Sequence, residues 1–146
     1  MRELVFVLEF RGSAAAGPDG KRRARSTAPS VSFSTVMAAD GIHAASKPLD
    51  GEQAILESSV ERFADGTFLE DGTITYGRAG SVTFETVGRG TVGPAPLEGW
   101  SVGGVTWTVT AGTGRFGGAR GLITSNFTVN ARGEVVDHHV ARLYLP

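Results

Sequence analysis

The chain has 146 residues, of which 40% are hydrophobic and 20% charged, and its net charge is −1. This length suffices for one domain with a sizeable core, and the lack of cysteine excludes disulfides, thiol nucleophiles and cysteine metal ligands. The charge balance gives no support to a nucleic-acid partner, and no apolar run approaches the ~20 residues of a membrane span. We expect a single cytoplasmic domain over residues 1–146, because the short apolar start of the chain lacks the features of a signal peptide. A composition rich in arginine, alanine and glycine suggests a bacterial source with a GC-rich genome.

The first third of the chain predicts two strands, each followed by a loop. Residues 4–10 alternate with period two and are apolar on both faces, apart from Glu9. Residues 12–30 have no periodicity and contain much glycine, alanine, proline and charge, so we predict a mobile loop there. A second strand is predicted over residues 31–37 and a second loop over residues 38–51.

The middle of the chain contains two strong hairpin signals. A predicted strand over residues 54–63 runs into Asp65-Gly66, and Asp71-Gly72 follows six residues later. We expect one of these dipeptides to form a hairpin turn and the other a β-bulge. The next strand is predicted over residues 73–76.

The last part of the chain predicts the clearest strands. A strand over residues 81–87 leads into a link rich in glycine and proline, residues 88–99. Residues 103–129 then predict a strand, a glycine-rich bend and a second strand, because both flanks alternate with period two. After a turn at residues 131–133, a final strand is expected over residues 135–145.

Evenly spaced strands with no convincing helix between them predict an all-β fold, either an antiparallel sandwich or a closed barrel. The first and last strands are apolar on both faces, which suits their pairing with each other. We therefore favour the barrel.

Three patterns that resemble chemical motifs lack the required context. Gly112–Gly117 matches GxGxxG, and Gly99–Gly103 matches GxSxG with Ser101 as the nucleophile, but each is followed by strand rather than by the helix that both motifs need. Asp137 and His139 share one strand face, which gives two potential metal ligands where a catalytic site needs three. We expect no metal and read these residues as a polar outer face.

Candidate site residues are ionisable groups set among apolar strand neighbours. A carboxylate inside an apolar barrel has its pKa raised by desolvation and can act as a general acid or base near neutral pH. Glu9 is the sharpest case and Glu57 the second, although both would be ordinary solvated groups if their faces look outward. On the last strand, His138, Arg142 and Tyr144 share one face, which could line a ligand cavity or form a subunit contact.

The bend from Thr110 to Gly121, TAGTGRFGGARG, resembles the GTGxFxGAxG bend of dirigent proteins, plant allene oxide cyclases and their bacterial relatives with an allene-oxide-cyclase-like barrel. The physical interpretation agrees, because its glycines permit a tight reversal and Phe116 can plug one end of a core. The resemblance implies an antiparallel eight-stranded barrel, often dimeric or trimeric, with an apolar small molecule inside.

The resemblance also implies a function. Such cyclases use no cofactor and act by orienting a reactive substrate and stabilising charge. We hypothesise a cofactor-independent cyclase or isomerase for an apolar metabolite, in a homo-oligomer and in bacterial secondary metabolism; the alternatives are a non-catalytic carrier with a lipocalin-like cavity and a structural module with a filled barrel. The candidate catalytic residues are Glu9, Glu57 and Arg142, and the candidate ligand-binding residues are Tyr76, Trp107, His138 and Tyr144.

Overall fold

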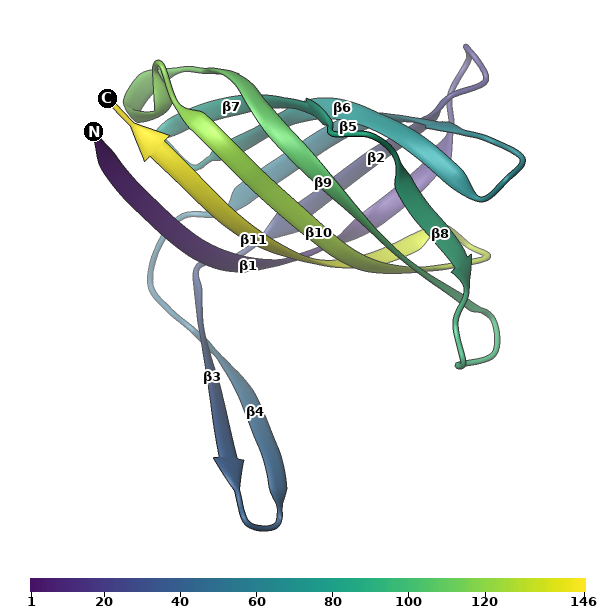
Figure 1. The fold of residues 1–146 in the computed structure, drawn as a ribbon, viewed down its shortest axis with the longest axis horizontal. Coiled ribbons are helices and arrows are strands. Elements are labelled where there is room, and N and C mark those ends of the chain that lie inside the picture. Colours follow the sequence, from purple (N-terminus) through teal and green to yellow (C-terminus); the bar gives the residue numbers. More distant parts are fainter.

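The protein is a closed antiparallel β-barrel with one projecting hairpin (Figure 1). The computed structural model describes residues 1–146. The strand order β10-β11-β1-β2-β5-β6-β7-β9 returns to β10 through a β9–β10 pairing, which closes eight strands into a ring. β8 extends this ring beside β9 and β6. The elements are β1 (Arg2–Ala16), β2 (Arg22–Ala28), β3 (Val31–Ala38), β4 (Gly41–Pro48), β5 (Ala54–Arg62), β6 (Thr67–Tyr76), β7 (Gly80–Thr86), β8 (Gly90–Pro94), β9 (Trp100–Gly112), the 3-10 helix η1 (Gly114–Phe116), β10 (Arg120–Asn130) and β11 (Glu134–Leu145).

The first and last strands pair with each other, as predicted from their two-sided apolar character. β1 and β11 are antiparallel neighbours from the Arg2–Leu145 pair to the Ser13–Glu134 pair. Their contact is the seam that closes the barrel and leaves neither terminal strand with a free edge. The predicted all-β barrel is therefore confirmed.

Alternate residues of each barrel strand face a common interior. Trp107 lies at its centre, with its ring 4.2 Å from the Phe84 ring and 5.0 Å from the His139 ring, measured between ring centroids. Burial of these large side chains is the main stabilising contribution to such a core. The largest fully buried apolar side chains are Phe10, Phe68, Ile74, Val82, Phe84, Trp107, Ile123 and Leu143.

The glycine-rich bend between β9 and β10 is a barrel corner. Gly114 and Gly118 have φ values of 58° and 73°, a left-handed conformation that suits glycine. Phe116 of η1 is buried and packs against Tyr76, with 5.2 Å between their ring centroids. The 3-10 helix η1 has only three residues and β10 begins at Arg120, so no α-helix is present to receive a dinucleotide phosphate.

The two predicted loops in the first third of the chain are wrong. Within residues 12–30, β1 continues to Ala16 and β2 begins at Arg22, so only a short turn separates two strands that pair with each other. Within residues 38–51, β4 pairs with β3. Backbone pairing forms strands in these segments even though no hydrophobic period marks them.

The two hairpin signals have different outcomes. Asp65-Gly66 forms the β5–β6 turn, where Gly66 has a φ of 83° and the Asp65 carboxylate accepts a hydrogen bond from the Thr67 backbone N–H at 3.0 Å. The bulge expected at Asp71-Gly72 is wrong, because both residues pair regularly within β6. The register shift lies instead between β7 and β9, after Thr83.

The β3–β4 hairpin pairs with no other strand and projects away from the barrel wall (Figure 1). Nearly all of its residues are exposed, among them Val36, Met37 and Ile42. The Phe33 ring near its base lies 6.3 Å from the His138 ring on the outer face of β11. In the structure no helix is long and apolar enough to cross a membrane.

Candidate functional site

A cavity of about 60 Å³ opens at the end of the barrel that lies away from both termini. The β1–β2, β5–β6 and β10–β11 turns surround this end, on the right in Figure 1. Most of its lining is apolar, and its polar groups come from five different strands. The lining residues are Ser13, Ala14, Arg22, Ala24, Ser26, Leu56, Val60, Arg62, Phe68, Glu70, Val92, Phe127, Val129, Val135 and Asp137.

Glu70 is the central acidic group of this cavity. It faces inward from β6, on the same strand face as Phe68 and Ile74. Thr86 holds its backbone from the neighbouring strand, since the threonine hydroxyl accepts from the Glu70 N–H and donates to the Glu70 carbonyl, both at 2.7 Å. The Ser58 hydroxyl donates a hydrogen bond to the Glu70 carboxyl at 2.6 Å.

The environment of Glu70 favours its protonated form. Burial raises the pKa of this carboxyl to about 8, the charges of Asp137 and Asp71 act in the same direction, and the hydrogen bond from Ser58 opposes them. At neutral pH the Glu70 carboxyl therefore carries a proton that it can donate. A carboxylic acid of this kind is suited to general acid catalysis.

Asp137 is the second carboxyl of the cavity, and two neighbours hold it in place. The Ser125 hydroxyl donates to its Oδ1 at 2.7 Å, and the His139 Nε2 lies 2.8 Å from its Oδ2. The His139 ring is buried against Phe10 and Trp107, and its Nδ1 has no hydrogen-bond partner. The hydrogen bond to Asp137 fits a histidine tautomer in which Nε2 carries the proton.

Two arginines line the same cavity at its outer end. Arg22 is the first residue of β2, and its Nη2 donates a hydrogen bond to the Ala14 carbonyl at 3.1 Å. Arg62 is the last residue of β5. Burial lowers the pKa of Arg62 from its ordinary value, and the positive charge of Arg22 adds to this effect.

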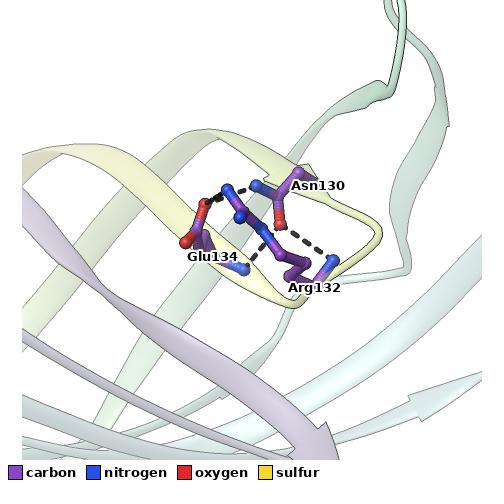
Figure 2. Close-up of polar contacts among 3 residues, drawn as sticks. All are labelled: Asn130, Arg132 and Glu134. Atoms are coloured by element: carbon purple, nitrogen blue, oxygen red, sulfur yellow. Dashed lines mark hydrogen bonds and ion pairs between the residues drawn. The ribbon is translucent and has the colours of Figure 1, made fainter.

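A polar network braces the β10–β11 turn beside the cavity (Figure 2). The Asn130 side-chain oxygen accepts hydrogen bonds from the backbone N–H groups of Arg132 and Glu134, each at 3.0 Å. The Glu134 carboxylate accepts one from the Asn130 amide at 2.5 Å and one from Arg132 at 3.1 Å. These contacts fix the start of β11, three residues before Asp137.

The three predicted catalytic residues lie on the outside of the barrel. The Oε1 atom of Glu9 lies 2.9 Å from the Arg11 Nη2 and 3.4 Å from the His138 Nε2, in ion-pair contacts on the outer face. Glu57 is exposed on the outer face of β5. Arg142 is exposed on β11, where it pairs with a glutamate of β1. Strand parity turns each of these side chains to the outer face, so of the two alternatives for Glu9 and Glu57, the outward one is present in the structure.

The four predicted ligand-binding residues are dispersed. His138 and Tyr144 point outward from β11, whereas Trp107 is buried in the core between the two barrel ends. Tyr76 lines a second, more open pocket of about 340 Å³ beside Phe116, at the end of the barrel near the termini. Burial raises the pKa of Tyr76 above its ordinary value.

The polar outer face expected at Asp137 and His139 is also wrong. Both residues share one strand face, as the sequence indicates, but that face is the interior. Asp137 and His139 form no cluster of three potential metal ligands with any other histidine, aspartate or glutamate of the structure.

Glu70 and the two arginines of the cavity are not among the residues predicted from the sequence. Glu70 could be assigned to the inner face because it alternates with apolar residues of the same strand, Phe68, Ile74 and Tyr76. The Asp71-Gly72 hairpin signal, however, limits the predicted strand to residues 73–76 and so excludes Glu70. Arg22 falls in the segment predicted as a loop, so no strand face could be assigned to it.

No protein-family model and no curated protein matches the chain. Among solved structures, it is similar to a pterocarpan synthase dirigent protein, with 13% sequence identity, a TM-score of 0.33, and coverage of 99% of this chain and 92% of that chain. The barrel itself is established by the strand pairing of this protein, and the cavity by its own side chains.

Proposed function

We propose that the protein is a cofactor-independent isomerase or cyclase that moves protons on a small, largely apolar molecule held in the cavity at the turn end of the barrel. The observation that carries this proposal is a pair of carboxyl groups, Glu70 and Asp137, in one mainly apolar cavity. Their environments differ, because Glu70 has a pKa of about 8 and Asp137 is held by a serine and a histidine.

Such a pair can supply an acid and a base without a cofactor. Glu70 donates its proton to an oxygen of the substrate while charge develops there, and Asp137 accepts a proton from carbon or oxygen. The hydrogen bonds from Ser125 and His139 hold the Asp137 carboxylate in one orientation. Apolar walls restrict the conformers of the bound molecule, which favours ring closure or double-bond migration over competing reactions.

A carrier protein is the second candidate function. The same cavity could bind an apolar molecule without changing it, and the lining alone does not separate the two functions. A carrier, however, has no use for an inward, proton-bearing carboxyl next to a second carboxyl, since burying both is costly. This cost favours the catalytic function.

The isomerisation of cyclohex-3-en-1-one tests the proposal. In this reaction a base removes a proton from C2, an acid stabilises the carbonyl oxygen, and a proton returns at C4, so that conjugated cyclohex-2-en-1-one forms. We expect the protein to accelerate the reaction at pH 7, as followed by the ultraviolet absorbance of the product. Glu70→Gln should lower the rate by at least about 100-fold, the lower range for general acid catalysis.

Glu61→Gln is the matched control, because it makes the same change on the exposed outer face of β5. It should keep the wild-type rate. A wild-type rate equal to that of buffer, or a Glu70→Gln variant as fast as the wild type, would contradict the proposed catalysis.

We further propose that the protein is a homo-oligomer in which the β3–β4 hairpin packs on a second copy. A two-stranded hairpin is marginally stable by itself, and this one exposes Met37 and Ile42 on one face. The outer wall of the barrel offers a matching apolar surface on adjacent strands, in which Val7 of β1 lies opposite Val140 of β11. Both surfaces belong to every copy, so the contact can be reciprocal.

A further inference from the structure

Two arginines stand at the mouth of the cavity without a carboxylate partner. Arg22 and Arg62 both line the cavity, and neither forms an ion pair, although five other arginines of the chain do. The carboxyl groups of the cavity are also engaged elsewhere, since Glu70 bonds to Ser58 and Asp137 bonds to Ser125 and His139.

Arg22 has a buried donor without an acceptor, and its positive charge acts on the neighbouring Arg62. The Nε of Arg22 is buried and has no acceptor, which costs the desolvation of a charged donor. Arg62 is exposed at the end of β5, yet its pKa is lowered by partial desolvation of its guanidinium group and by the nearby positive charge of Arg22. A bound oxyanion would accept a hydrogen bond from the free Nε–H of Arg22. Its negative charge would also offset the repulsion between the Arg22 and Arg62 guanidinium groups.

Strand register places the arginines close to the proposed reacting groups. Arg22 on β2 lies opposite Val60 on β5, and Val60 lies opposite Glu70 on β6, so the three residues form one row across neighbouring strands. With about 4.8 Å between adjacent strands, the Arg22 and Glu70 backbones are about 10 Å apart. Arg62 follows Val60 by two residues on the same face, toward the end of β5.

We propose that the natural ligand of this cavity is a small monocarboxylic acid, whose carboxylate is bound by Arg22 and Arg62 while its apolar body extends along the row toward Glu70. Val60, Phe68 and Phe127 provide apolar contacts for that body. The guanidinium fork matches the planar carboxylate, and a single negative charge suits a cavity that also contains Asp137. This assignment rests on the proposed function, because it names the substrate class of the same site.

Binding of 3-phenylpropionate and its neutral amide, 3-phenylpropanamide, tests the assignment. The two probes have the same apolar body and differ in charge, so calorimetric titration of both separates the two contributions. We expect the wild type to bind the acid about tenfold more tightly than the amide, the effect of one charge-assisted hydrogen bond. Arg22→Met and Arg62→Met should each reduce this preference, and the double variant should abolish it.

Arg25→Met is the matched control, because Arg25 is an exposed arginine of the same strand β2. It should keep the preference for the acid, and a loss equal to that of Arg22→Met would overturn the assignment in favour of a general charge effect. Arg22→Lys, which keeps the charge but loses the fork, should weaken acid binding without changing amide binding.

The amide distinguishes failure of this assignment from failure of the proposed function. Equal binding of acid and amide to the wild type would overturn the carboxylate site and leave the apolar cavity as a ligand site. A preference for the acid that survives in the double variant would overturn it too. Binding of neither probe at millimolar concentration would contradict both proposals.

Discussion

Glu70 differs from the other glutamates of the barrel in the direction of its side chain. Glu9 and Glu57 are also glutamates within barrel strands, yet they lie on the outer face, and neither could be separated from Glu70 by residue type alone. Whether a glutamate faces inward or outward depends on its place in the alternation of the strand, and this can be read only when the strand is recognised at its full length. Because Asp71-Gly72 is a strong hairpin signal in sequence, β6 was divided and the parity of Glu70 was lost.

The raised pKa of Glu70 predicts a stability that falls as pH rises. The folded protein keeps the proton up to about pH 8, whereas the unfolded chain releases it near the ordinary value of 4.5. Below that ordinary value the contribution to stability is fully present, and it is lost as pH rises toward 8. We expect the free energy of unfolding to fall by on the order of 1.4 kcal/mol per pH unit between about 5 and 8, as measured by urea denaturation.

Glu70→Gln should remove this dependence, since the amide has the same shape and does not titrate. Glu61→Gln should retain it. The pKa values of Asp19, Glu52, Asp65 and Glu134 are lowered, so the contribution of these carboxyl groups to stability changes only below the ordinary carboxyl range and not between pH 5 and pH 8. A wild-type stability that is constant from pH 5 to pH 8 would show that Glu70 is ionised in the folded state.

At the scale of elements, segments with strong side-chain signals were predictable and segments formed by pairing alone were not. The bend at Gly114 and Phe116 is predictable from the sequence, because its glycines permit positive φ values and its aromatic residue is buried. The inward residues of β2 include small ones such as Ala24 and Ser26, so no hydrophobic period marks this strand. β4 is exposed on both faces and likewise carries no period.

The β3–β4 hairpin gives a prediction about assembly. Ile42→Asp places a charge on the apolar face that Met37 shares across the hairpin. We expect this variant to sediment as a monomer in analytical ultracentrifugation while the wild type sediments as a dimer or trimer, because burying an unpaired carboxylate in the contact is costly.

Ala45→Asp adds the same charge to the opposite face of β4, where Ala45 pairs with Ser34. This variant should associate as the wild type does. A monomeric wild type, or an Ile42→Asp variant that still associates, would show that the hairpin does not mediate self-association.

For the whole molecule, the sequence predicted the architecture better than the site. Even strand spacing and two-sided apolar terminal strands were sufficient for a closed barrel, since both follow from local patterns. The site depends on which faces meet in the interior, and that depends on the register of every strand around the ring. The bacterial source stays a prediction from composition, and the cytoplasmic location stays a prediction as well.

The proposed chemistry depends on a protonated Glu70, and carbon NMR of the glutamate side chains measures this protonation state directly. Carboxyl resonances of ¹³C-labelled protein are followed through a pH titration, and the Glu70→Gln variant identifies the Glu70 signal by its absence. We predict that this resonance titrates near pH 8, as burial beside Asp137 requires. A Glu70 resonance that titrates near 4.5 would contradict the proposed role of Glu70, because the cavity would then hold no acid at neutral pH.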